Sequence, residues 1–127
     1  MALALCAGWA FWRGRGSVRL AAALVVAASL LTAAANLRIA HAEAQWAIFW
    51  IDVGALAGLA ILWVRAQRRW LLFLTAIQFL AVCEHLAMAL DRGMEPRAYV
   101  GTLYLLFIGI LACLVWGTHD RPRDGAR

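Results

Sequence analysis

The sequence predicts an all-α membrane protein: a membrane-embedded antiparallel four-helix bundle with a short interfacial N-terminal segment. Two observations lead to this fold class. The 127 residues are 65% hydrophobic and only 15% charged, with a mean hydropathy of +0.77, whereas soluble domains are about half apolar and about a quarter charged. The chain also contains four apolar stretches of the ~20 residues that a helix needs to cross a bilayer.

The first predicted element is the apolar segment 1–12, which is too short to span a bilayer. Trp9, Trp12 and Arg13 are side chains that anchor such a segment at the membrane interface. A rival interpretation makes residues 1–42 a cleaved secretory signal that ends in an Ala-His-Ala site. The apolar, tryptophan-bearing start and the unusual length of the apolar run favour retention over cleavage.

Four long helices follow, at about 18–40, 46–64, 70–90 and 98–117. Because the connections between them are short, consecutive helices should pack antiparallel. Pro96 stands just before the last helix, where its missing N–H costs little. Residues 1–117 are therefore expected to form one transmembrane domain, and residues 118–127 a disordered cytoplasmic tail.

The arginines predict the orientation. All 12 basic residues are Arg, and the net charge is +5. Most of them stand before or at the start of the first long helix, between the second and third, or after the fourth: Arg13, Arg15, Arg19, Arg65, Arg68, Arg69, Arg121, Arg123 and Arg127. Because cytoplasmic loops carry the excess of positive charge, both termini are expected in the cytoplasm.

The same arginines bear on partners and location. They lie between apolar segments and not on one soluble face, so no nucleic-acid partner is expected. The absence of Lys is typical of GC-rich bacterial coding. The expected location is therefore a bacterial inner (plasma) membrane.

Ionisable residues inside the apolar helices indicate a candidate site, because burying them costs several kcal/mol. Asp52 lies six residues from the outer end of its helix, roughly 9 Å deep. The next helix runs the other way and places Glu84 and His85 at a similar depth. Gln78 shares a face with His85 at i, i+7. Asn36, Tyr99 and Thr102 reach this level from the other two helices.

The predicted ligand- or ion-binding residues are Asp52, His85, Glu84, Gln78, Asn36 and Thr102. Two interpretations stay open. In one, these residues form an outward-opening site for a small ligand, proton or ion. In the other, Asp52 and His85 form a buried hydrogen-bonded pair that only fixes helix register.

No catalytic or metal site is predicted. Neither serine of the chain lies near His85, so a serine nucleophile is not expected. Cys6, Cys83 and Cys113 stand in apolar stretches without metal-binding spacing, as buried small hydrophobic residues do. No cofactor is expected, with haem bound through His85 as an alternative.

Small residues predict where helices approach closely. Gly54 and Gly58 form a GxxxG motif, and Gly109, Cys113 and Gly117 make a second stripe on the last helix. Such stripes let two helix backbones come together. We expect them to pack within the chain, with homodimerisation through one stripe as the alternative.

Three features resemble small four-helix bacterial membrane proteins to which no activity is assigned. They are Asp52 early in a middle helix, an Arg-Trp pair at the start of the next helix, and Gln78 seven residues before His85. The resemblance covers about residues 46–117 and implies an architecture without an activity.

Two better-defined families are similar in part. The size and helix count resemble the small multidrug resistance transporters, whose first helix carries an embedded Glu, but the predicted helix 18–40 has no acid. The segment from Gln78 to Asp91 is similar to the haem-bearing helix of succinate dehydrogenase membrane anchors. Gln78 stands where that family has a His, so the haem function is not carried over.

The expected function is that of a non-catalytic subunit or accessory of a membrane assembly. Its partners would be the lipid bilayer and another membrane protein or a second copy of itself. One alternative is a small oligomeric transporter or channel for a proton, ion or small polar solute, with its site in the outer half of the bundle. Another is a membrane anchor that binds haem or quinone.

Overall fold

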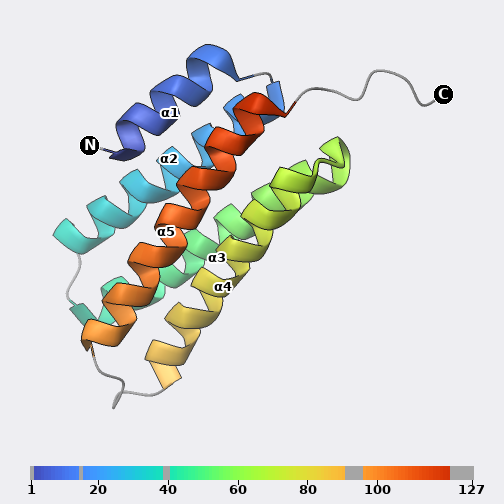
Figure 1. The fold of residues 1–127 in the computed structure, drawn as a ribbon. Helices are drawn as coiled ribbons and strands as arrows, with labels where there is room; N and C mark the ends of the chain where they lie inside the picture. Colours follow the sequence, from blue (N-terminus) through green and yellow to red (C-terminus); the bar gives the residue numbers. More distant parts are fainter. Residues whose placement is uncertain (1, 15, 39–40, 91–95, 121–127) are drawn as a thin grey trace.

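The computed structural model describes residues 2–14, 16–38, 41–90 and 96–120, which form helices joined by short turns (Figure 1). The helices are α1 (Ala2–Arg13), α2 (Gly16–Arg38), α3 (His41–Ala66), α4 (Arg69–Leu90) and α5 (Pro96–His119). Each of α2 to α5 contains a segment long and apolar enough to cross a membrane. The predicted all-α fold class is therefore confirmed.

The helices extend beyond the predicted apolar segments. α3 begins at His41 and α5 ends at His119, so Thr118 and His119 belong to a helix and not to the predicted tail. The hydroxyl of Thr118 donates to the carbonyl of Val115 at 2.7 Å. Hydropathy marks only the part of a helix that suits hydrocarbon, whereas backbone hydrogen bonding continues into the polar region beyond it. The rest of the predicted tail, 121–127, lies outside the described residues.

The four long helices form an antiparallel bundle in which each contacts its neighbours along the chain, and α5 returns to contact α2. The interface between α2 and α5 is the smallest of these helix interfaces. The short helix α1 packs against both α2 and α5 (Figure 1). We call the end that carries the α3–α4 turn the turn end. The distal end is the opposite one, where α2 and α4 finish and α3 and α5 begin.

The turn end holds the apolar core. Trp70, Leu71 and Leu74 of α4 are buried against Leu59 of α3 and Leu114 of α5. α1 and α2 contribute small side chains to the same core, namely Ala10, Ala21 and Ala22. Because small side chains let helix axes approach, α1 closes the groove between α2 and α5 at this end.

The predicted small-residue stripes pack within the chain at most positions. A Cβ added to Gly58 would lie 3.2 Å from Leu24, one added to Gly109 would lie 3.0 Å from Ile77, and one added to Gly117 would lie 2.9 Å from the Trp70 ring. Cys113 is buried beside them. Gly54 is different, because nothing lies within 4 Å of such an atom. The expected intrachain contact at Gly54 is absent from the described part of the chain.

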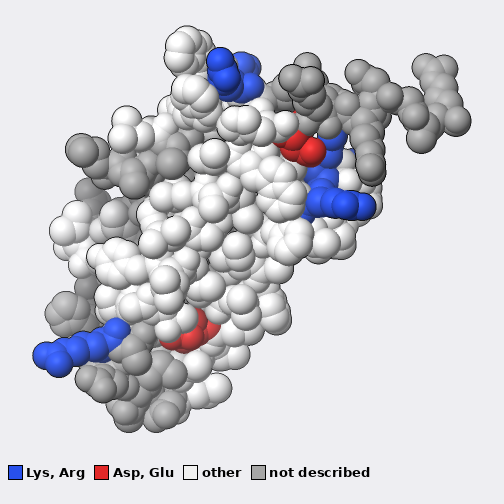
Figure 2. Space-filling model, in the orientation of Figure 1, with Lys and Arg blue, Asp and Glu red and all other residues white. Residues whose placement is uncertain are grey.

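Large apolar side chains cover the outside of the bundle. Leu37, Trp50 and Leu105 are each more than half exposed, as are many others on the long helices. Figure 2 shows a broad uncharged middle on one face, with Arg side chains gathered toward the two ends. An exterior of this kind suits hydrocarbon as the solvent. The chain is a small multi-pass membrane protein.

The turn between α3 and α4 contains one strained residue. Gln67 has a φ of 50°, a left-handed conformation that costs an ordinary L residue about 1–2 kcal/mol. Its N–H donates to the carbonyl of Trp63 at 2.7 Å, which closes the end of α3. The neighbouring Arg68 forms an ion pair with Asp120 at 3.5 Å and so ties this turn to the end of α5.

Gln67→Gly should stabilise the bundle, because Gly adopts this conformation without the steric penalty. The gain over Gln67→Ala should be about 1 kcal/mol. Both variants lose the side-chain hydrogen bond from Gln67 to Val64, so Ala is the matched control. Denaturant titration in detergent micelles, followed by circular dichroism, measures the difference. Equal stability of the two variants would contradict the expectation.

Candidate functional site

Four side chains form one hydrogen-bonded group in the distal half of the bundle, which we call the polar cluster: Asp52 from α3, Gln78 and His85 from α4, and Tyr99 from α5. The Gln78 amide donates to Asp52 Oδ1 at 2.9 Å. His85 Nε2 lies 2.8 Å from Asp52 Oδ2. The hydroxyl of Tyr99 lies 2.5 Å from His85 Nδ1. The cluster therefore links three helices.

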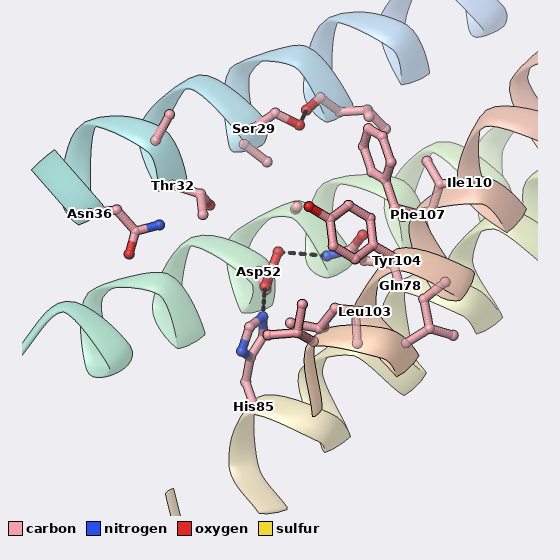
Figure 3. Close-up of a pocket in the computed structure, with 17 residues that line it drawn as sticks. Ser29, Thr32, Asn36, Asp52, Gln78, His85, Leu103, Tyr104, Phe107 and Ile110 are labelled. Atoms are coloured by element: carbon pink, nitrogen blue, oxygen red, sulfur yellow. Dashed lines mark hydrogen bonds and ion pairs between the residues drawn. The ribbon is translucent and has the colours of Figure 1, made fainter. Parts of the chain in front are cut away.

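Helix geometry explains how Asp52 meets two residues of α4. Gln78 and His85 are seven residues apart, so both point from the same face of α4 toward α3. Each then reaches one oxygen of the carboxylate, as Figure 3 shows. Gln78 is buried, and the side chains of His85 and Asp52 are 11% and 16% exposed. The carboxylate is thus held on both oxygens in a place with little access to solvent.

Hydrogen-bond chemistry constrains the protons of the cluster. An ionised Asp52 only accepts hydrogen bonds, so His85 must donate to it through an Nε2–H. In a neutral imidazole the other nitrogen then accepts, and the hydroxyl of Tyr99 donates to Nδ1. In this arrangement each of the three hydrogen bonds of the cluster has one donor and one acceptor. Among the described residues, no buried side-chain nitrogen or oxygen lacks a partner.

A cavity of about 490 Å³ adjoins the polar cluster between α2 and α5. Asp52, Gln78 and His85 lie along it, and α5 contributes the rings of Tyr104 and Phe107 (Figure 3). Most of its other lining is aliphatic, including several alanines of α2. These short side chains leave space where α2 and α5 diverge, and α1 fills that groove only toward the turn end.

The structure places the predicted site residues in two groups. Asp52, Gln78, His85 and Asn36 line the cavity. Glu84 and Thr102 do not line it: Glu84 is half-buried on α4, and Thr102 is exposed on α5. Helix geometry explains why Glu84 does not line the cavity, because it lies about 100° around α4 from His85.

Some residues of the site were not among the predicted binding residues. Tyr99 was expected only at the same depth, but it is the hydrogen-bond partner of His85. Ser29 and Thr32 line the cavity together with Asn36. Their spacing, i, i+3 and i+7, puts all three on one face of α2. This spacing of polar residues in an otherwise apolar helix could have identified them from the sequence.

His85 has both ring nitrogens engaged, one with Asp52 and the other with Tyr99. An axial ligand to haem iron must present a free nitrogen, so haem binding would require one of these contacts to break. Among the described residues, no group of three or more His, Cys, Asp or Glu side chains is arranged to hold a metal ion. The cluster is better suited to hydrogen bonding and proton transfer than to metal ligation.

Comparisons with protein-family models, with curated proteins and with solved structures find no match to this chain.

Proposed function

We propose that this chain is a non-catalytic membrane subunit that binds a small lipid-soluble molecule in the cavity between α2 and α5. The observation that carries the proposal is the position of the polar cluster on the wall of an otherwise mostly apolar cavity. Its volume, about 490 Å³, falls within the range of ~300–1,000 Å³ typical of small-molecule sites. Such sites combine apolar walls with a few convergent polar groups.

The lining favours a ligand with two chemically different parts. The carboxylate of Asp52 accepts hydrogen bonds and donates none when ionised, so it complements a hydroxyl or ammonium head group. Leu103, Phe107 and Ile110 of α5 offer an apolar surface for the rest of the molecule. A purely polar solute or a bare ion would leave that surface without a partner. The lining therefore favours an amphipathic ligand.

A channel for an ion or a small polar solute has less support. A conducting path must stay polar across the whole membrane. Gln78 is the buried polar residue nearest the turn end in the described part of the chain, and beyond it the core is apolar. Leu59, Leu74 and Leu114 are fully buried there. Conduction would require these packed helices to separate.

The orientation and the assembly partner are parts of the same proposal. The arginines near the turn end support a cytoplasmic turn end and an outward-facing distal end, in a bacterial inner membrane. Gly54 is exposed on α3 and has open space beside it. A small residue in that setting suits close packing of a helix from another membrane protein or from a second copy.

Filling the cavity should weaken binding. Ala33 and its neighbour Ala34 are both exposed, but only Ala33 lines the cavity. In lipid nanodiscs, octylammonium and octanol should cause saturable changes in the nitrogen NMR signals of His85, and octane should cause none. Ala33→Phe should weaken this response at least about tenfold, and Ala34→Phe should leave it unchanged. An equal response in the two variants, or saturation by octane, would count against the proposal.

A further inference from the structure

We infer that Tyr99, His85 and Asp52 form a proton path from the distal end of the bundle to the cavity. The three side chains are in continuous contact, at 2.5 Å from Tyr99 to His85 and at 2.8 Å from His85 to Asp52. Both distances are within hydrogen-bond range. The imidazole stands between the other two groups and uses a different nitrogen for each.

The two ends of this chain of contacts lie in different places. Tyr99 is in the first turn of α5, at the distal end, and it does not line the cavity. Asp52 and His85 do line the cavity. A cluster that only fixed helix register would need no such connection between the helix ends and an internal space.

The proton transfer balances without a further reactant. With Asp52 ionised, Tyr99 donates to Nδ1 and Nε2–H donates to Asp52, so every hydrogen bond points toward the cavity. A hydronium ion at the distal end gives its proton to the Tyr99 oxygen and becomes water. The original hydroxyl proton of Tyr99 moves to Nδ1. The proton on Nε2 is then shared with the carboxylate, and the His85–Asp52 pair has gained one proton and one unit of positive charge.

Among the described residues, the ionisable groups nearest this path come from three helices. α3 contributes Asp52, α4 contributes Glu84 and His85, and α5 contributes Arg97, Tyr99 and Tyr104. The α2 wall of the cavity supplies serine, threonine and asparagine side chains, which do not titrate in the ordinary pH range.

The use of this proton rests on the proposed function. Protonation of the pair removes the net negative charge that attracts a hydrogen-bond-donating head group. Acidification at the distal side would therefore weaken binding of such a ligand, an ammonium most of all. The path itself involves no ligand, so it is tested on the empty protein, and its failure is distinguishable from a failure of ligand binding.

Two hydroxyl-bearing residues of α5, Tyr99 and Thr118, provide the experiment. In nanodiscs, the rate of proton uptake after rapid acidification is followed by the infrared bands of the Asp52 carboxyl group and the His85 imidazole. The carboxyl band is identified by its loss in Asp52→Asn, and the imidazole band by its loss in His85→Leu. Tyr99→Phe removes the first hydroxyl of the path but keeps the ring, and uptake should become at least about tenfold slower. Thr118→Val removes a hydroxyl at the opposite end of the same helix, outside both the path and the cavity, and should retain the wild-type rate. Equal rates in wild type and Tyr99→Phe would overturn the inference.

A second measurement uses the wild-type protein and does not depend on how the variants fold. The uptake rate is measured in mixtures of light and heavy water. Because several protons move along the path, the rate should depend on the deuterium fraction along a curve. A straight line, which indicates a single proton in transit, would overturn the inference.

Discussion

Trp70→Ala should lower the free energy of unfolding of the bundle by about 3 kcal/mol. Trp70 is the largest fully buried side chain of the described residues, at 2% exposed. Its ring lies against the backbone of Gly117, which has no side chain of its own to fill the space. Helix association within lipid depends on van der Waals packing more than on the exclusion of water. The substitution removes that packing and leaves a cavity between α4 and α5.

Trp50→Ala is the matched control, because Trp50 is 65% exposed on α3 and contributes little to contacts between helices. Unfolding by sodium dodecyl sulfate in mixed micelles, followed by circular dichroism, compares the two variants with wild type. We expect a stability change of less than about 0.5 kcal/mol for Trp50→Ala. If the two substitutions destabilise equally, the core does not lie where the structure places it.

The fold could be predicted because the bilayer limits the choices. A segment in hydrocarbon must satisfy its own backbone hydrogen bonds, so each long apolar run becomes a helix. The depth of Asp52 and His85 followed from counting residues along antiparallel helices. The shared face of Gln78 and His85 followed from the helical repeat. These inferences need only local geometry.

The contacts between helices could not be predicted in the same way. A hydrogen-bonded Asp52–His85 pair was one of the two interpretations that the sequence left open, and the two side chains do meet. That Asp52 also reaches Gln78 depends on how far α3 slides along α4, and the hydropathy pattern does not specify that offset. The GxxxG motif predicted contacts at both glycines, but Gly58 packs against Leu24 while Gly54 has open space. The motif specifies a smooth helix face and not the neighbour that covers it.

The cavity was also beyond prediction from the sequence. It exists because alanines of α2 face α5 where the two helices diverge, and because α1 fills their groove only toward the turn end. The N-terminal segment was expected to lie at the interface, on the basis of its length and its tryptophans. The structure shows that it also packs against the bundle through Ala10, which is 1% exposed. Its apolar composition alone did not reveal that contact.

His85→Leu should destabilise the bundle by about 3 kcal/mol, whereas the double variant Asp52→Leu/His85→Leu should recover to within about 1 kcal/mol of wild type. The single substitution leaves Oδ2 of Asp52 without its donor in a site that is only 16% exposed. The double substitution removes both polar partners and lets apolar side chains occupy the space. Ser29→Ala is the control, because that hydroxyl lines the cavity but bonds to Val25 of its own helix.

The same variants separate the two interpretations of the polar cluster, because stability and ligand binding respond differently. A cluster that only fixes helix register requires the double variant to lose structural uniqueness, which broadens its NMR signals. A cluster that serves the cavity allows the double variant to remain well folded, since apolar substitutes pack as well as a buried polar pair does. It should then no longer respond to octylammonium. Additive effects of the two single substitutions would show that Asp52 and His85 are not coupled, contrary to the 2.8 Å contact.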